Sequence, residues 1–420
     1  MKSWSKDSIR ADIQASFVVF LIALPLGLGV ATASGYPPIA GIISGIIGGL
    51  IVGFLSGSPL QVSGAAAGLS IVCLQFVQDY GLAQMTFIVF LAGLFQIIGA
   101  LFRIGTWFQS VSTSVIYGML AGIGLLIFSN QFHVMLDLKA PGSGLINLTE
   151  IPFKLYELIF SSTLSLDAFI CGVIALTVLY AWPRFARPSW SLWMPGSLLA
   201  VLVASVSAWV LGLQINFVKI PENIFQNMKV GFDFSVISNV LVLTFCALKL
   251  AFIASTESLL CASALDQIHE GQKTDYNREL MAQGVGNTLC GIFGGLPMTG
   301  VIVRSSANVM SGAKTRLSAI LHGAWLLLFV LYFPQVISLI PASALAALLV
   351  FTGLKLINFE MMHKIHQQSL WEFFIFSITM ITVFSYDLLW GVVLGIGLGS
   401  LKAIPSLSLN KSSIQSKEKN

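Results

Sequence analysis

Two short segments decide the fold of this chain: SPLQVSGAAAG at residues 58–68 and GGLPMTGVIVR at residues 294–304. Each has a proline in a stretch that can run extended, then a glycine, then an apolar helix too short to cross about 30 Å of hydrocarbon alone. Paired segments of this kind in two halves of a chain are typical of transporter binding sites. Two independently kinked helices are the alternative explanation.

The rest of the chain has the composition of a membrane protein. It is 56% hydrophobic and 10% charged, with a mean hydropathy of +0.87. A soluble domain carries about 25% charged residues, so this chain lacks the polar surface needed to face water. We therefore predict an all-α polytopic membrane protein in a lipid bilayer. The net charge of +4 does not indicate nucleic acid, because the basic residues fall in short loops.

Hydropathy, interrupted at charged residues, proline and glycine, predicts about fourteen spans in two sets of seven. The first set covers residues 13–33, 38–55, 63–77, 85–102, 112–130, 166–181 and 195–213. The second covers residues 242–264, 280–293, 301–312, 317–333, 342–354, 370–384 and 388–402. The short segments are third in each set. Because seven is odd, the halves insert in opposite orientations, which predicts a 7+7 inverted repeat whose half-helices (spans 3 and 10) meet at the midplane.

The distribution of positive charge predicts the orientation. Of the 22 lysine and arginine residues, sixteen fall in loops on the side of the N-terminus and four in the opposite loops. The positive-inside rule then places both termini in the cytoplasm, with the protein in the plasma (inner) membrane. The first apolar run is too long for a cleaved signal peptide. We expect a cytoplasmic segment at 1–12, a transmembrane domain at 13–402 and a polar cytoplasmic tail at 403–420.

The starts of the two short helices predict an anion site. Each start exposes unpaired backbone N–H groups and a partial charge of about +0.5, which attracts anions without a basic side chain. Ser63 and Thr299 can add hydroxyl donors. The small residues Gly64, Ala65 and Ala66 would let a ligand approach the backbone closely.

Charged residues inside the predicted spans are further candidates. Arg304, in the first turn of the second short helix, adds a full positive charge, or clamps neighbouring carbonyls. Glu257, near the middle of span 8, could bind a proton, bind Na⁺ with help from Thr256 or Ser258, or neutralise Arg304. Lys249, earlier in the same span, could line the same cavity or extend toward the membrane surface.

No motif predicts an enzyme or a bound cofactor. The five cysteines are scattered through apolar segments without CxxC spacing, which indicates neither a disulfide framework nor a metal site. Walker, HExxH and GxSxG sequences are absent, so neither ATP-driven pumping nor an embedded hydrolase is supported. We expect no cofactor other than a coupling ion, H⁺ or Na⁺, and no metal site unless Na⁺ binds near Glu257.

Motifs along nearly the whole chain resemble those of the SulP family of anion permeases. The matching stretches are ALPLGLG at 23–29, GYPPIAG at 35–41, GSP at 57–59, ESLL at 257–260, NREL at 277–280, QG at 283–284 and GAKT at 312–315. The resemblance implies a core domain (spans within 13–102 and 242–333) that moves against a gate domain (spans within 112–213 and 342–402). It also implies a homodimer and transport of sulfate, bicarbonate, chloride or dicarboxylates.

The resemblance implies a site as well. Its substrate pocket maps onto Leu26, Val30, Ala65, Ala66, Val301, Ile302 and Arg304, and its coupling residue onto Glu257. Ala65 stands where many members carry proline, and small residues replace an aromatic found in some pockets. Cys261 stands where some Na⁺-coupled members have threonine, which favours protons. The tail is shorter than the STAS domain common in the family, which needs about 100 residues, so we expect that domain to be absent.

The leading hypothesis is secondary active transport of a small inorganic oxyanion, bicarbonate or sulfate, in symport with H⁺ or Na⁺ by an elevator-type movement. A nucleobase:cation symporter shares the fold and also uses a carboxylate in span 8. Its Gln-Asn signature followed by glycine and threonine is missing from PMTG at 297–300. An uncoupled anion channel or exchanger is the other alternative.

Overall fold

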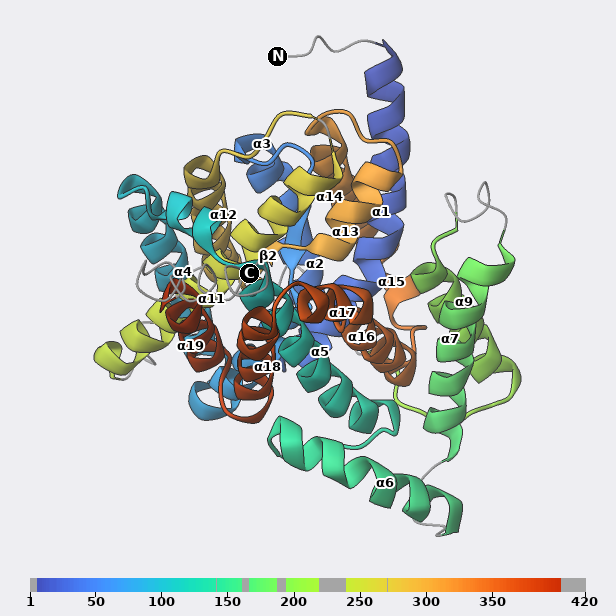
Figure 1. Ribbon diagram of the computed structural model, residues 1–420. Coiled ribbons are helices and arrows are strands. Elements are labelled where there is room, and N and C mark those ends of the chain that lie inside the picture. The colour runs from blue at the N-terminus through green and yellow to red at the C-terminus, as the bar shows by residue number, and fades with distance from the viewer. Residues whose placement is uncertain are drawn as a thin grey trace, which may run out of the picture.

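The computed structural model describes residues 6–140, 142–160, 166–186, 194–218, 239–269 and 271–401. This part of the chain is helical apart from loops and one pair of short strands (Figure 1). Within it, seven helical segments are long and apolar enough to cross a membrane, and four shorter apolar helices accompany them. The predicted all-α polytopic fold is confirmed. The predicted tail at 403–420 lies outside the described residues.

The first half of the chain matches the predicted order of spans. Its elements are α1 (Lys6–Ala33), α2 (Pro38–Ile47), η1 (Gly48–Val52), α3 (Gly53–Leu55), β1 (Ser63–Ala65), η2 (Ala67–Leu69), α4 (Ser70–Leu101), η3 (Ile104–Ser110), α5 (Thr113–Met135), α6 (Gly144–Phe160), α7 (Leu166–Phe185) and α9 (Gly196–Val210). Helix α4 is two helices joined at Gly81, whose φ of 80° and ψ of 164° are non-helical. Glycine adopts such a φ without steric cost, and the joint separates predicted spans 3 and 4.

The second half repeats this order. Its elements are α11 (Val240–Ile268), α12 (Tyr276–Phe293), β2 (Met298–Gly300), α13 (Ile302–Met310), α14 (Leu317–Tyr332), α15 (Pro334–Ile337), α16 (Ala342–Leu356), α17 (Phe359–Gln368), α18 (Leu370–Ser385) and α19 (Leu388–Leu401). Each predicted span overlaps a helix. Helix α1 begins at Lys6, inside the segment expected to precede the first span, and two further helices, α6 and α17, were not predicted as spans.

Helix α6 lies across the lower end of the molecule in Figure 1. It exposes Phe153, Tyr156 and Phe160, while Lys154 and Glu157 form an ion pair at 2.8 Å. A helix with an apolar face and charged residues suits the boundary between hydrocarbon and headgroups. A search for uniformly apolar spans passes over such a helix.

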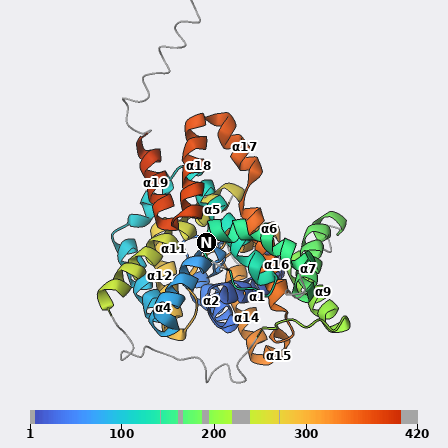
Figure 2. The same cartoon turned by 90° about the horizontal axis from the view of Figure 1, so that it is seen from below.

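The packing between helices is reciprocal between the two halves. Helix α1 packs on α14, and its counterpart α11 packs on α4; likewise α5 packs on α18, and α16 packs on α7. If each helix is replaced by its counterpart in the other half, the contact of α1 with α14 becomes that of α11 with α4, and the contact of α5 with α18 becomes that of α16 with α7. Seen from below, α7 and α9 lie at one edge and α18 and α19 at another (Figure 2). The inverted repeat stays a prediction, which these reciprocal contacts support.

Candidate functional site

The two segments that decide the fold meet as an antiparallel pair of three-residue strands. Ser63 of β1 pairs with Gly300 of β2, and Ala65 pairs with Met298. Helix η2 begins two residues after β1, and α13 begins two residues after β2. The two helix starts therefore lie beside the strand pair, as the sequence predicts for two half-helices that meet.

One face of α12 holds both strands in place. Glu279, Gln283 and Asn287 are four residues apart, so they project from one face of the helix. Gln283 Nε2 donates to Ser63 Oγ at 2.7 Å and to Glu279 Oε1 at 2.8 Å. The amide of Asn287 accepts from the N–H of Met298 at 2.7 Å and donates to its carbonyl at 3.0 Å. This α12 polar face thus fixes β1 and β2 relative to each other.

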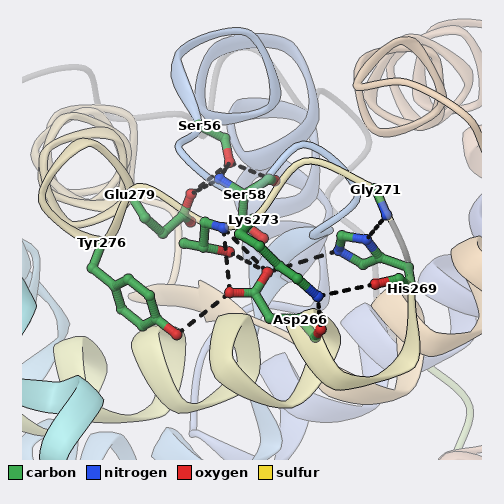
Figure 3. Close-up of polar contacts among 9 residues, drawn as sticks. Ser56, Ser58, Asp266, His269, Gly271, Lys273, Tyr276 and Glu279 are labelled. Atoms are coloured by element: carbon green, nitrogen blue, oxygen red, sulfur yellow. Dashed lines mark hydrogen bonds and ion pairs between the residues drawn. The ribbon is translucent and has the colours of Figure 1, made fainter.

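Glu279 also fixes the loop that precedes β1, as Figure 3 shows. Its Oε2 accepts from the hydroxyl of Ser56 at 2.5 Å and from the N–H groups of Gly57 and Ser58, both at 3.0 Å. Its Oε1 accepts from Gln61 Nε2 at 2.9 Å. A carboxylate with 0% exposure is costly to bury unless its lone pairs are satisfied, and these bonds satisfy them. Sequence reasoning noted Glu279 only within the NREL motif and missed this role.

Asp266 organises the connection from α11 to α12, also drawn in Figure 3. Its Oδ1 accepts from the hydroxyl of Thr274 at 3.0 Å and from the Thr274 N–H at 3.2 Å. Lys273 Nζ donates to the backbone carbonyls of Asp266 and His269. These bonds close the loop directly before α12, so they help to position the start of the helix whose polar face holds the strands.

A cavity of about 80 Å³ lies beside the two helix starts. Its walls include Ala67 and Gly68 of η2, residues 300–303, and Glu257 of α11, with α5 and α16 opposite. Glu257 Oε2 is buried and has no hydrogen-bond partner among the described residues. A Cβ on Gly68 would lie 2.8 Å from Glu257 Oε1, so the carboxylate lies against the helix start. The cavity can hold a small polar ligand between helix N-termini and a protonatable group.

Arg304 lies outside this cavity. Its side chain is 1% exposed, and no guanidinium nitrogen has a hydrogen-bond partner within the described ranges. A Cβ on Gly64 would lie 2.4 Å from Nη1, and one on Gly27 would lie 3.8 Å from Nη2. The guanidinium therefore packs against β1 and α1. Among the described residues its nitrogens donate no hydrogen bond to Glu257 or to a backbone carbonyl, so neither structural alternative left open by the sequence is seen here.

The remaining predicted substrate residues fall into two groups. Val301 and Ile302, which the family resemblance assigns to the substrate pocket, are among the residues that line the cavity. The others are buried beside it but are not among its lining residues: Leu26, Val30, Ser63, Gly64, Ala65 and Ala66. Leu26 and Val30 belong to the apolar interior around α1. Ser63, Gly64, Ala65 and Ala66 directly precede in sequence the residues of η2 that line the cavity.

The predicted partners of Glu257 are engaged elsewhere. Thr256 Oγ1 donates to the carbonyl of Phe252 in its own helix at 2.8 Å. Ser258 Oγ donates to the carbonyl of Ala254 and accepts from the N–H of Gly300 at 3.1 Å, which ties α11 to β2. Cys261, by contrast, lines the cavity together with Glu257. Ser258 therefore positions a strand, and neither hydroxyl is directed to the carboxylate.

Lys249, whose role the sequence left open, forms an ion pair with Asp387. Its Nζ lies 2.5 Å from Oδ2, and the two side chains are 23% and 21% exposed. Asp387 precedes α19 and also accepts from the N–H of Leu389 at 2.8 Å. The ion pair therefore joins α11 to the loop between α18 and α19.

A helical membrane protein whose broken segments meet around a small cavity belongs to the class of integral membrane transporters. The model of the sulfate permease family matches residues 9–379, so this chain belongs to the sulfate permease family. That is a family of transporters of small inorganic anions, which is not enzymatic. The resemblance stated from the sequence is thereby confirmed.

Two relatives and two solved structures are similar along most of the chain. YvdB of Bacillus subtilis, a candidate sulfate transporter, is 28% identical over 404 residues, which are 94% of this chain and 73% of that protein. The bicarbonate transporter BicA of Picosynechococcus sp. is 25% identical over 424 residues, with 96% and 71% covered. The transmembrane domain of a cyanobacterial BicA superposes with a TM-score of 0.78 at 23% identity, covering 93% of this chain and 98% of that one. The murine Slc26a9 anion transporter in its inward-facing state gives 0.77 at 18% identity, covering 96% and 69%. At these identities the structures show a shared fold.

Proposed function

We propose that this protein is a secondary active transporter that carries a small inorganic oxyanion, sulfate or bicarbonate, across the plasma membrane. One observation carries the proposal: the 80 Å³ cavity joins two helix N-termini to the unpartnered carboxylate of Glu257. Helix N-termini attract anions, whereas a carboxylate repels them unless it is protonated. A site with both features suits an anion that binds together with a proton.

The anion is held mainly by the backbone in this proposal. The starts of η2 and α13 both contribute lining residues to the cavity, and Gly68 has no side chain that would cover the first of these starts. Arg304 acts from behind β1, where its unpaired guanidinium adds positive potential without touching the ligand. In a low-dielectric interior such a charge acts over several ångströms. Arg304 is therefore assigned an electrostatic role instead of direct contact.

Proton coupling is favoured over sodium by the side chains around Glu257. A sodium ion needs several oxygen ligands, and neither Thr256 nor Ser258 is among the residues that line the cavity with Glu257. Cys261, which shares the cavity wall, offers a thiol instead of an oxygen. A proton needs only the carboxylate. We therefore assign Glu257 as the proton-coupling residue, with Na⁺ as the alternative.

The cavity walls suit an elevator-type movement. Residues of η2, α11 and α13 belong to the proposed core domain, and residues of α5 and α16 to the proposed gate domain. A site that lies between the core and gate domains is carried across the membrane when the core domain slides against the gate domain. We further propose a homodimer with both termini in the cytoplasm, on the basis of the family and of the distribution of positive charge.

Flux into proteoliposomes tests this proposal. Purified protein should accumulate labelled sulfate or bicarbonate above its external concentration when the inside is made alkaline, and chloride or uracil should serve as comparison solutes. Accumulation driven by Na⁺ and insensitive to pH would make sodium the coupling ion. Equilibration without accumulation would indicate a channel or exchanger, and accumulation of uracil alone would indicate a nucleobase symporter; each of these results overturns proton-coupled oxyanion transport.

A further inference from the structure

A second cavity, of about 330 Å³, also reaches the start of η2, where Gly68 is one of its lining residues. Its lining includes the polar side chains of Gln75, Gln78, Asn130, Ser143 and Asp387. The first cavity is lined by residues of the N-terminal half of α5, from Thr113 to Ile123. The second is lined by residues of its C-terminal half, from Ile123 to Asn130. Since an α-helix rises 1.5 Å per residue, the two cavities extend in opposite directions along α5.

The two cavities share two lining residues, Gly68 and Ile123. Gly68 belongs to η2, at the helix start that faces Glu257. Ile123 belongs to α5, opposite, and is 2% exposed. Because glycine has no side chain, Ile123 supplies the only side chain common to both linings in the described part of the chain. It therefore stands where the cavities would otherwise join.

We propose that Ile123 is the barrier between the two cavities, and that it makes transport coupled by preventing anions from passing while the core domain is at rest. This inference rests on the proposed transport function and deepens it. An apolar side chain at a narrow point excludes a hydrated anion, because the ion would lose water contacts and gain no polar partner. The amides of the second cavity can hold an anion with part of its water, but Ile123 offers it nothing.

In alternating access, Ile123 would then stay in place while the core domain moves past it. Ile123 belongs to the proposed gate domain, whereas Gly68 and Glu257 belong to the proposed core domain. Sliding the core carries the helix start past Ile123, so the bound anion leaves one cavity and enters the other without a continuous path. Leu120, about one turn before Ile123, lines the first cavity alone, and Ile127, about one turn after it, lines the second alone. These two residues provide matched controls.

Anion leak in proteoliposomes tests the barrier. With no pH gradient, a membrane potential should drive sulfate flux through Ile123→Ala about tenfold or more faster than through wild type, which corresponds to a barrier lowered by at least 1.4 kcal/mol. The leak rate, as distinct from coupled uptake, should stay near that of wild type in Leu120→Ala and Ile127→Ala, and Ile123→Leu should restore the seal. If wild type accumulates sulfate while Ile123→Ala neither leaks nor loses accumulation, the barrier is elsewhere.

Thiol labelling provides a measurement that does not need transport. In a chain whose five native cysteines are replaced by alanine, a membrane-impermeant maleimide should label Leu120→Cys and Ile127→Cys from opposite sides of the membrane. Labelling of both from the same side would show that the cavities are not separated, and would overturn the inference. A wild type that carries no oxyanion would instead refute the proposed function, while opposite-side labelling would still place a barrier between residues 120 and 127.

Discussion

Lys249 and Asp387 form an ion pair, with Nζ of the lysine 2.5 Å from Oδ2 of the aspartate, although 138 residues separate them. The pair links α11 to the segment that begins α19. Asp387 also lines the 330 Å³ cavity, so its carboxylate lies on the path that we propose for anions. Lys249 therefore cancels a negative charge that would otherwise repel the substrate.

Replacing this lysine should weaken anion entry. In Lys249→Met the carboxylate is left unpaired, and repulsion of about 1 kcal/mol at close range in a water-like dielectric predicts a several-fold higher KM for sulfate with little change in kcat. Uptake measured against sulfate concentration at low ionic strength would show the effect, and added salt should reduce it. Lys249→Met combined with Asp387→Asn should return the KM toward wild type. A single variant with an unchanged KM at low salt would contradict this role.

Glu257→Gln should separate binding from coupling. Glutamine resembles the protonated carboxylate, so the variant should bind anion with little dependence on pH and exchange it across the membrane. It should not accumulate anion when a pH gradient is imposed, because proton and anion binding are linked reciprocally and the proton site is gone. Counterflow of labelled sulfate and gradient-driven uptake measure the two properties separately. A Glu257→Gln protein that still concentrates anion in response to a pH gradient would rule out coupling through this residue.

Arg304→Met should lower anion affinity without lowering stability. Loss of the positive charge behind β1 removes attraction for the ligand, and an affinity loss of about tenfold would correspond to 1.4 kcal/mol. Because the guanidinium is buried without a hydrogen-bond partner within the described ranges, its removal also relieves a desolvation cost, so the Tm should stay level or rise. Equilibrium binding and thermal unfolding of the purified variant measure both effects.

Gly64 offers a second test of Arg304. A Cβ at this position would lie 2.4 Å from Nη1 of Arg304, so Gly64→Ala should displace the guanidinium and weaken anion binding. In the Arg304→Met background the same change should have a much smaller effect, because residues in contact give non-additive energies. Additive losses of affinity would show that Gly64 acts through the ligand instead. Ala66→Phe, which adds bulk at the end of β1, should abolish binding in either background.

Asn287→Leu should loosen β2 and with it the anion site. The change removes both bonds to Met298 and leaves its N–H and carbonyl buried and unpaired, at about 1–3 kcal/mol for each group. We expect a lower Tm together with weaker anion binding. Thr288→Val is a suitable control, because the Thr288 hydroxyl donates to the carbonyl of Gly284 within α12. Equal Tm and equal affinity in wild type and Asn287→Leu would show that the α12 polar face does not support the site.

The order of the spans and the meeting of the half-helices were predictable because local patterns encode them. Runs of apolar residues mark spans, and proline with glycine marks the breaks at 58–68 and 294–304. The α12 polar face was also within reach, since Glu279, Gln283 and Asn287 recur every four residues. Helix α6 was missed because Glu150, Lys154 and Glu157 interrupt its apolar residues.

The candidate site was predicted only in part, because side-chain direction depends on tertiary packing. Glu257 was identified from its charge inside a span, and Val301 and Ile302 from the family resemblance; all three line the cavity. The direction of Arg304 could not be read from a nine-residue helix that follows a break. Ile123 was beyond sequence reasoning, because an isoleucine in an apolar span is indistinguishable from ordinary packing until α5 is placed against η2.

The bonds that fix the loop before β1 have a consequence for biosynthesis. They span 218 to 223 residues of chain, from Ser56, Gln61 and Ser63 to Glu279 and Gln283. At 5–20 residues per second, α12 is synthesised roughly 10–45 s after this loop. Throughout that interval the polar groups of residues 56–63 lack the side-chain partners that they have in the finished protein. The loop before β1 therefore takes its final arrangement only after α12 has been synthesised, so the first half of the chain does not complete its share of the site on its own.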